Sequence, residues 1–385
     1  MKASLRRSRL AVVALATMGA LLIGAGARAE DKLLNEIVEF DGAMLFFGSH
    51  VPGMVIGAVR NGETAVFGFG EASDGSGKAP DGRTVMRIGS ITKAFTGQVL
   101  AGLLDRGSVK LTDPLQERLG WPVKVPERDG KPIRLIELAT HTSGLPREVE
   151  RAPGPPDDPF RTLTREAYIK GLQTDPLLFA PGTGGLYSNF AFDLLAAALE
   201  HAGGKPYDAL LKDIVLDRAG MTDTIFSLRA GDGARLFQGH GFEGKAMPDV
   251  KATPVMAGAS SLYSTPDDIL RWLAWHLDRF SPRDTELRLL DHAAYVPRDG
   301  LKPVSGFDES GHMDAMGLGW IVMAPKGDRP LILQKAGGLQ GIFSYAAFAP
   351  TRGVGVFVAI NQFNVPAALG MAAAANDLIA QLAPR

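Results

Sequence analysis

The segment Ser90-Ile91-Thr92-Lys93 combines a hydroxyl and an amine at a spacing suited to nucleophilic catalysis. Hydrophobic residues recur with helical periodicity over residues 91–104, so Ser90 opens a predicted helix and Lys93 lies about one turn along the same face. A serine hydroxyl needs a neighbouring proton acceptor, and a lysine amine can serve when burial lowers its pKa. The helix start adds a free backbone N–H group, which is half of an oxyanion hole. The same spacing is also typical of a helix cap beside a solvated lysine, so it needs further support.

A tyrosine and an asparagine in the middle of the chain could extend such a site. Tyr187-Ser188-Asn189 follows a glycine-rich loop and opens a predicted helix over residues 189–201. Alternate residues of an extended segment point the same way, so Tyr187 and Asn189 could face one cleft. A phenol can shuttle a proton if neighbouring cations depress its pKa. The alternative is a buried tyrosine next to an ordinary asparagine cap.

A glycine-rich strand end near the C-terminus supplies a third candidate segment. Lys335-Ala336-Gly337-Gly338 ends one predicted strand, and a glycine-rich strand edge lets a substrate backbone approach closely. The Gly338 N–H group could be the second oxyanion donor, and Lys335 could provide a cation for the tyrosine or for a substrate carboxylate. The alternative is a hairpin turn with a solvated lysine.

The elements that must position these residues fall into two groups. Strands are predicted at both ends of the chain, at residues 54–59, 64–72, 316–324, 331–335, 342–349 and 354–361. The first two are joined by Asn61-Gly62, which is a hairpin signal. A helix is predicted over residues 366–382, and helices dominate the middle at residues 164–172, 189–201, 207–218 and 266–277. We therefore predict an α+β fold. Its sheet domain is discontinuous, at residues 30–105 and 310–385, and a mainly helical domain with long loops is inserted at residues 106–309.

Composition and the N-terminal segment restrict the function further. A basic start, an apolar run over residues 10–26 and the small-x-small pattern Ala27-Arg28-Ala29 predict a signal peptide over residues 1–29, rather than a permanent membrane anchor. Five of the 41 basic residues lie in this segment, which leaves 36 against 42 acidic residues, a net charge of −6. This charge does not suit nucleic-acid binding, and no later segment is apolar enough to predict an integral membrane span. The absence of cysteine excludes disulfides and thiolate chemistry.

Taken in chain order, Ser-x-x-Lys, Tyr-x-Asn and Lys-x-Gly resemble the motif set of the active-site-serine penicillin-recognising enzymes. Tyr in the second motif is similar to class C β-lactamases and to the carboxypeptidases and esterases built like them. Residues 138–148, 187–195 and 315–326, together with Gln334-Lys335, narrow the resemblance to the AmpH-type D-alanyl-D-alanine carboxypeptidase/endopeptidases. The resemblance extends over about residues 40–380.

This resemblance implies a β-lactamase/transpeptidase-like fold, with an antiparallel sheet flanked by helices and the inserted helical domain. It also implies a periplasmic serine hydrolase that removes terminal D-Ala from peptidoglycan peptides and cleaves D-Ala–diaminopimelate cross-links through a Ser90 acyl-enzyme. Muropeptides are then the substrates, β-lactams are covalent ligands, and peripheral association with the inner membrane stays open. The expected catalytic residues are Ser90, Lys93 and Tyr187, and the expected substrate-binding residues are Asn189, Lys335, Gly337 and Gly338.

One position departs from the family pattern. The third motif of this family usually has Thr or Ser between Lys and Gly, where its hydroxyl helps to hold a substrate carboxylate, and this chain has Ala336. Lys335 or a nearby amide such as Gln340 could compensate for the missing hydroxyl. The departure keeps two alternatives open, a class C-like β-lactamase or esterase on the same scaffold, and a non-catalytic penicillin-binding sensor.

Metal chemistry finds no support in the spacing of the seven histidines, which form no His-Glu-x-x-His pattern. We therefore expect no metal ligands and no cofactor. His141, in the stretch Thr-His-Thr-Ser-Gly-Leu-Pro, is interpreted as a structural turn residue.

Overall fold

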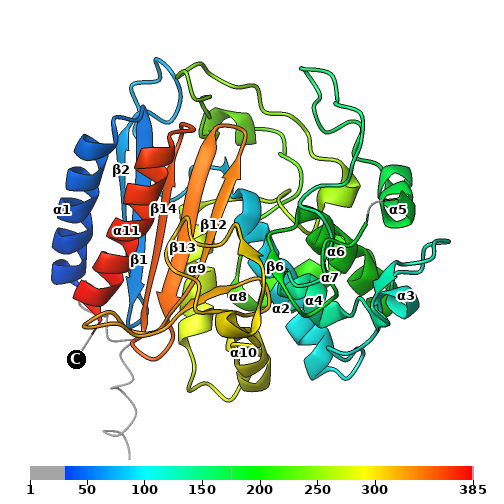
Figure 1. The fold of residues 1–385 in the computed structure, drawn as a ribbon. Coiled ribbons are helices and arrows are strands. Elements are labelled where there is room, and N and C mark those ends of the chain that lie inside the picture. The colour runs from blue at the N-terminus through cyan, green and yellow to red at the C-terminus, as the bar shows by residue number, and fades with distance from the viewer. Residues whose placement is uncertain (1–30, 175, 384–385) are drawn as a thin grey trace, which may run out of the picture.

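The computed structural model describes residues 31–174 and 176–383, and the signal peptide predicted over residues 1–29 lies outside them. Its centre is an eight-stranded sheet with the strand order β2-β1-β14-β13-β12-β11-β10-β8, in which every neighbouring pair is antiparallel (Figure 1). The strands are β1 (Gly53–Arg60), β2 (Glu63–Gly70), β8 (Val296–Pro297), β10 (Ala315–Met316), β11 (Ile321–Met323), β12 (Ile332–Leu339), β13 (Ile342–Ala349) and β14 (Val354–Ile360). The predicted antiparallel sheet, built from both ends of the chain, is confirmed.

The hairpin between β1 and β2 follows from its two turn residues. Asn61 and Gly62 have positive φ angles of 53° and 82°, as both central residues of a type I′ turn require. Arg60 consequently pairs with Glu63, and the antiparallel register continues to the far end of both strands. The predicted Asn-Gly hairpin is therefore present.

Helices cover both faces of the sheet. Helices α1 (Lys32–Ser49) and α11 (Val365–Leu382) pack on one face, and α9 (Pro266–Leu277) packs on the other (Figure 1). Successive side chains along a strand alternate between the two faces. Met54 accordingly belongs to the core beneath α1 and α11, whereas Val55 belongs to the core beneath α9. The sheet thus separates two hydrophobic cores.

Among the described residues, α11 is the one helix long and apolar enough to cross a membrane, by length and composition alone. Met371, Ala375 and Ile379 on this helix are buried against the sheet and α1. Packing on the sheet therefore accounts for its apolar composition.

The remaining helices lie mainly on the side of the molecule away from α1 and α11. They are α2 (Thr92–Asp105), α3 (Leu115–Arg118), α4 (Leu135–Ala139), α5 (Arg165–Thr174), α6 (Asn189–Gly203), α7 (Tyr207–Leu211), α8 (Asp217–Ala219) and α10 (Thr285–His292). Two-residue strands pair among them or in the loops: β3 (Met86–Arg87) with β7 (Tyr263–Ser264), β4 (Glu127–Arg128) with β5 (Lys131–Pro132), and β6 (Gly185–Leu186) with β9 (Val304–Ser305).

Helix α2 is the central element of this arrangement. Its residues are buried from Thr92 to Leu103, and it packs against both α6 and α10. A Cβ atom on Gly97 would lie 1.8 Å from the Leu318 carbonyl oxygen, so only glycine permits this approach of the two backbones. The element that carries the candidate nucleophile is therefore fixed by packing along most of its length.

Four helices were not predicted from the sequence, namely α1, α10 and the short helices α3 and α4. Helix α1 was not predicted because it exposes Phe40, Met44 and Phe47, so its hydrophobic residues do not gather on one buried face. Helix α10 lies inside a segment interpreted as a loop. Helix α9 and strand β8 fall within residues 106–309, the predicted helical domain, yet α9 packs on the sheet and β8 extends it.

Candidate active site

Ser90 is the middle residue of a short 3-10 turn that leads directly into α2, and the edge of β12 lies against this turn. Gly89 has a φ of +50°, and a Cβ atom on it would lie 2.6 Å from the backbone nitrogen of Gly338. A Cβ atom on Gly337 would lie 2.0 Å from the Ile88 carbonyl oxygen. Glycines on both elements thus allow the predicted nucleophile and the predicted second oxyanion donor to lie side by side.

Lys93 is fully buried, and its Nζ atom contacts three polar groups. It lies 3.1 Å from Ser90 Oγ, and it donates to Asn189 Oδ1 at 2.6 Å and to the Ala259 carbonyl at 2.9 Å. Burial, aided by the charge of Lys335, holds the pKa of Lys93 well below its usual value. A neutral amine has two N–H bonds and one lone pair, so the two carbonyl acceptors leave the lone pair for the Ser90 hydroxyl. This geometry suits Lys93 to accept the serine proton.

A second layer of buried groups fixes the Ala259 carbonyl. The backbone N–H of Ala259 donates to Asp193 Oδ1 at 2.9 Å, and the Tyr168 hydroxyl donates to Asp193 Oδ2 at 2.6 Å. Burial raises the pKa of Asp193 to about 8, against the effect of the Tyr168 hydrogen bond. The acceptor that faces Lys93 is therefore held by side chains from α5 and α6.

Tyr187 lies between the serine and the third motif. Lys335 Nζ donates to the Tyr187 hydroxyl at 3.3 Å, and Arg147 lies over the tyrosine ring, 4.8 Å from its centroid. Burial raises the pKa of Tyr187 above its usual value, although a hydrogen bond with Ser90 and the charge of Arg147 lower it. Proton shuttling by this phenol was made conditional on cations that depress its pKa, and here Arg147 does lower the pKa but burial outweighs it. A neutral phenol that contacts both Ser90 and Lys335 is suited to relay a proton.

His141 supports Tyr187 from behind. Its ring stacks on the tyrosine ring with centroids 4.5 Å apart, and its Nδ1 atom accepts a hydrogen bond of 3.0 Å from the Ser188 N–H. Its φ of +56° places it in a turn, in accord with the sequence interpretation, and burial holds its pKa well below the usual value. The ring therefore acts as a neutral, rigid support for the tyrosine.

Asn189 adjoins the lysine and does not line the cavity beside Ser90. Its Oδ1 atom accepts from Lys93, its side-chain N–H donates to the Glu148 carboxylate, and its backbone N–H donates to the Arg147 carbonyl at 2.8 Å. In this arrangement Asn189 orients Lys93. A substrate amide would have to displace Glu148 to reach the Asn189 amide.

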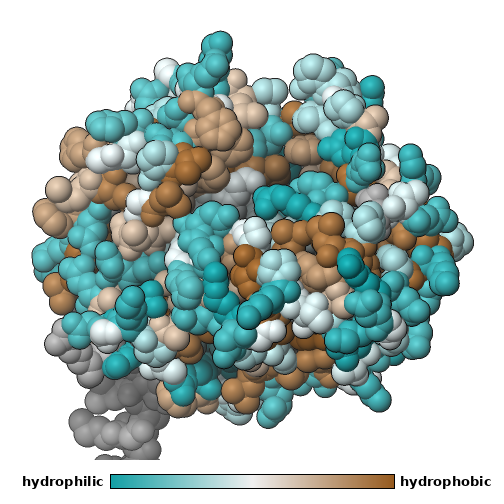
Figure 2. Space-filling view, in the orientation of Figure 1, coloured by the Kyte–Doolittle hydropathy of each residue, from teal (hydrophilic) through white to brown (hydrophobic). Residues whose placement is uncertain are grey.

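A cavity of about 420 Å³ adjoins the nucleophile. Ser90, Tyr187, Lys335, Gly337 and Gly338 all line it, so five of the seven predicted site residues share one wall. The far wall is apolar and comes from β13 and the first turns of α11. Figure 2 shows hydrophobic surface over the beginning of α11, next to a hollow at the end of the sheet.

Four polar residues of the site were not predicted from the sequence. Arg147 and Glu148 lie in a stretch quoted for the family resemblance, but their motif gave no chemical role. Ser310 and Gln334 also line the cavity, and the Ser310 hydroxyl donates to Gln334 Oε1 at 3.1 Å. The Gln334-Lys335 pair was also quoted for the family resemblance, but it gave Gln334 no chemical role.

Gln340, proposed from the sequence as a substitute for the missing hydroxyl at position 336, does not reach this cavity. It lies in the turn after β12 with a φ of +52° and lines a different pocket, beside Asp249 and Phe237. That suggestion is wrong, because the β12–β13 turn carries Gln340 away from the serine.

Replacement of Lys93 tests its assignment as the proton acceptor. We expect Lys93→Met to slow acylation of Ser90 by a fluorescent penicillin about 100- to 10,000-fold, since a positioned general base contributes a factor of this size. Lys110→Met, which changes an exposed lysine, should leave the rate unchanged. The rate is measured by gel fluorescence of samples quenched at a series of times. Labelling of Lys93→Met at the wild-type rate would contradict the assignment of Lys93 as the proton acceptor.

Comparisons with known proteins agree with this geometry. A model of the beta-lactamase family matches residues 31–381. The chain is 37% identical to the D-alanyl-D-alanine-carboxypeptidase/endopeptidase AmpH of Escherichia coli K12, over 92% of this chain and 90% of that protein. It is 24% identical to a beta-lactamase of Pseudomonas fluorescens, over 86% of this chain and 94% of that enzyme.

A solved structure gives the same result at the level of the fold. The crystal structure of a beta-lactamase/D-alanine carboxypeptidase from Yersinia pestis, complexed with citrate, superimposes with a TM-score of 0.81 at 36% identity. The match covers 92% of this chain and 99% of that one, so the predicted β-lactamase/transpeptidase-like fold is confirmed. The chain belongs to the beta-lactamase family.

Proposed function

We propose that this chain is a serine DD-peptidase that acts on peptidoglycan peptides as a D-Ala-D-Ala carboxypeptidase and a D-Ala–diaminopimelate endopeptidase. The observation that carries this proposal is the placement of Lys93 against Ser90 and of Lys335 against Tyr187 beside one cavity, in a chain 37% identical to AmpH over nearly its whole length. A non-catalytic sensor would have no need of this complete proton-transfer set.

Acylation begins at the Ser90 hydroxyl. As its Oγ atom attacks the carbonyl carbon of the penultimate D-Ala, Lys93 takes the hydroxyl proton. The negative charge that develops on the carbonyl oxygen is stabilised by the backbone N–H groups of Ser90 and Gly338. The C–N bond then breaks, and the Tyr187 hydroxyl passes a proton to the departing amine.

Deacylation uses the same groups in reverse. A water molecule attacks the ester carbonyl of the acyl-enzyme, and its proton passes to Tyr187, which gave a proton to the departing amine. The Ser90–acyl bond then breaks as Lys93 returns the serine proton to Oγ. Tyr187 is placed for this exchange because it contacts both Ser90 and Lys335.

Recognition of the substrate carboxylate cannot use a hydroxyl group at position 336, because this chain has Ala336 there. Gln334 and Ala336 lie on the same face of β12 because side chains alternate along a strand, and both line the cavity. The Gln334 side chain is fully buried, and the Ser310 hydroxyl donates to its Oε1 atom. Its Nε2 atom has no hydrogen-bond partner in residues 31–174 and 176–383. We therefore assign carboxylate binding to Lys335 and to the free Gln334 N–H group.

The cellular site follows from the predicted signal peptide. Cleavage after Ala29 would release the chain into the periplasm, where peptidoglycan is accessible. β-Lactams are expected to acylate Ser90 as covalent ligands, since they present a strained amide and a carboxylate to the same groups.

Digestion of muropeptides tests the proposed function. The mature chain should release D-Ala from pentapeptides and convert cross-linked dimers into monomers, whereas Ser90→Ala should do neither. Mass analysis of the products, alongside a short-chain ester and a chromogenic cephalosporin, separates the alternatives. Turnover of the ester or the cephalosporin without any change in the muropeptides would contradict a DD-peptidase.

Replacement of Gln334 tests carboxylate recognition. We expect Gln334→Leu to raise the KM for a D-Ala-D-Ala peptide about 10- to 100-fold, because it removes one hydrogen bond to a charged group. A matched peptide with a terminal carboxamide should be unaffected, and Ala336→Thr in the Gln334→Leu background should restore part of the loss. Equal effects on both peptides would show that Gln334 has only a packing role.

A further inference from the structure

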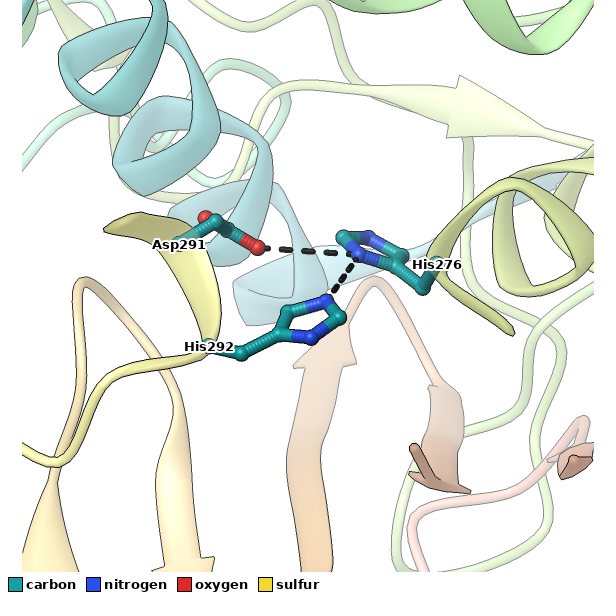
Figure 3. Close-up of side chains that lie close together, drawn as sticks. All are labelled: His276, Asp291 and His292. Carbon is teal, nitrogen blue, oxygen red and sulfur yellow. Dashed lines mark hydrogen bonds and ion pairs between the residues drawn. The ribbon is translucent and has the colours of Figure 1, made fainter. Parts of the chain in front are cut away.

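A cluster of potential metal ligands lies away from the active site, between α9 and α10. His276 comes from α9, and Asp291 and His292 are consecutive residues at the end of α10 (Figure 3). His276 Nδ1 lies 2.9 Å from His292 Nε2 and 3.6 Å from Asp291 Oδ2, and the three ligand atoms all lie within 4.8 Å of one another. Figure 3 shows the three side chains directed toward one another.

The buried carboxylate of Asp291 is poorly compensated by its neighbours. Its Oδ2 atom accepts one hydrogen bond, of 3.0 Å from Trp320 Nε1, and its Oδ1 atom has no hydrogen-bond partner among the described residues. Within the described part of the chain, no lysine or arginine forms an ion pair with Asp291, and its one ion-pair contact is His276. A fully buried carboxylate in this setting calls for a positive partner, because desolvation of an isolated charge is costly.

We propose that His276, Asp291 and His292 bind one divalent transition-metal ion of the Zn²⁺ type. Two imidazoles and a carboxylate are the donor set that Zn²⁺ accepts, whereas Ca²⁺ and Mg²⁺ prefer oxygen alone. Metal–ligand distances of about 2.0–2.2 Å in a tetrahedral shell place ligand atoms roughly 3.3–3.5 Å apart. The observed separations of 2.9 and 3.6 Å lie on either side of this spacing, so a small opening of the two rings admits the ion.

The surroundings hold the three ligands in place. The His276 ring stacks on Phe348 with centroids 4.9 Å apart and makes edge contacts with Trp272 and Trp320. The Trp320 N–H orients the carboxylate, as groups behind a metal ligand commonly do. His292 is only partly buried, so the ion has an approach from the surface and a fourth position for water.

Binding of the ion would connect two helices that pack on different parts of the fold. Helix α9 packs on β1 and β14, and α10 packs on α2, the helix that follows Ser90. An ion shared by α9 and α10 would join the sheet to the helix that carries the nucleophile. We therefore assign this site a stabilising role, and no role in the reaction.

Titration of the chelator-treated mature chain with Zn²⁺ alone tests the site. We expect one ion to bind per chain in calorimetry, with a rise in Tm of a few degrees once free Zn²⁺ far exceeds Kd. His292→Ala and Asp291→Asn should each lose both effects. Binding and stabilisation do not depend on peptidoglycan hydrolysis, so they are informative even if the proposed activity is wrong.

A matched control removes a different imidazole. His312 is exposed beside Asp308 and Asp314, and His312→Ala should retain both the stoichiometry and the Tm shift. Failure of the wild-type chain to bind Zn²⁺ would overturn the site and leave a hydrogen-bonded His–His pair. Equal binding by wild type and His292→Ala, with loss in His312→Ala, would place the ion at the surface and overturn it as well.

Discussion

The burial of the Lys93 amine is the constraint on which the active site depends. An amine taken out of water must either keep its charge at a high cost or lose its proton, and the two carbonyl acceptors at Asn189 and Ala259 satisfy a neutral amine with one lone pair free. That lone pair faces Ser90. The depressed pKa of Lys93 and the raised pKa of Tyr187 separate their tasks, so the amine accepts the first proton and the phenol relays protons later.

The rest of the fold excludes water from the Lys93 amine and holds the glycine-rich end of β12 close to Ser90. Helix α2 is buried from Thr92 to Leu103 and packs between α10 and α6, and glycines at 89 and 337 allow β12 to meet the serine turn. The antiparallel sheet draws most of its strands from the two ends of the chain, and this brings the glycine-rich end of β12 next to the turn that carries Ser90. We propose that Gln334, on the same face of β12 as Ala336, takes over the role of the missing hydroxyl.

Much of this site was predictable because it is encoded locally. Ser90 and Lys93 share one helical turn, Tyr187 precedes a helix, and the Gly337-Gly338 pair marks a strand edge, so spacing and residue type identify them. Interactions between distant segments were not predictable in this way. Tertiary packing determines the contact between Glu148 and Asn189 and the hydrogen bond from Ser310 to Gln334. It also determines that burial outweighs charge in setting the pKa of Tyr187. The His276, Asp291 and His292 cluster escaped for the same reason, since 14 residues separate the first two ligands. Helix α1 escaped because its apolar residues face outward as well as inward.

The ionisation of Lys93 is the most direct test of the account. Selective isotopic labelling of the lysine side chains, followed by NMR titration of the mature chain, reports the protonation of each amine, and Lys93→Arg identifies the resonance. We expect Lys93 to lose its proton at a pH well below the ordinary pKa of a lysine side chain, about 10.4. A transition of Lys93 that coincides with those of the exposed lysines would show a permanent cation, and would contradict its role as the base for Ser90.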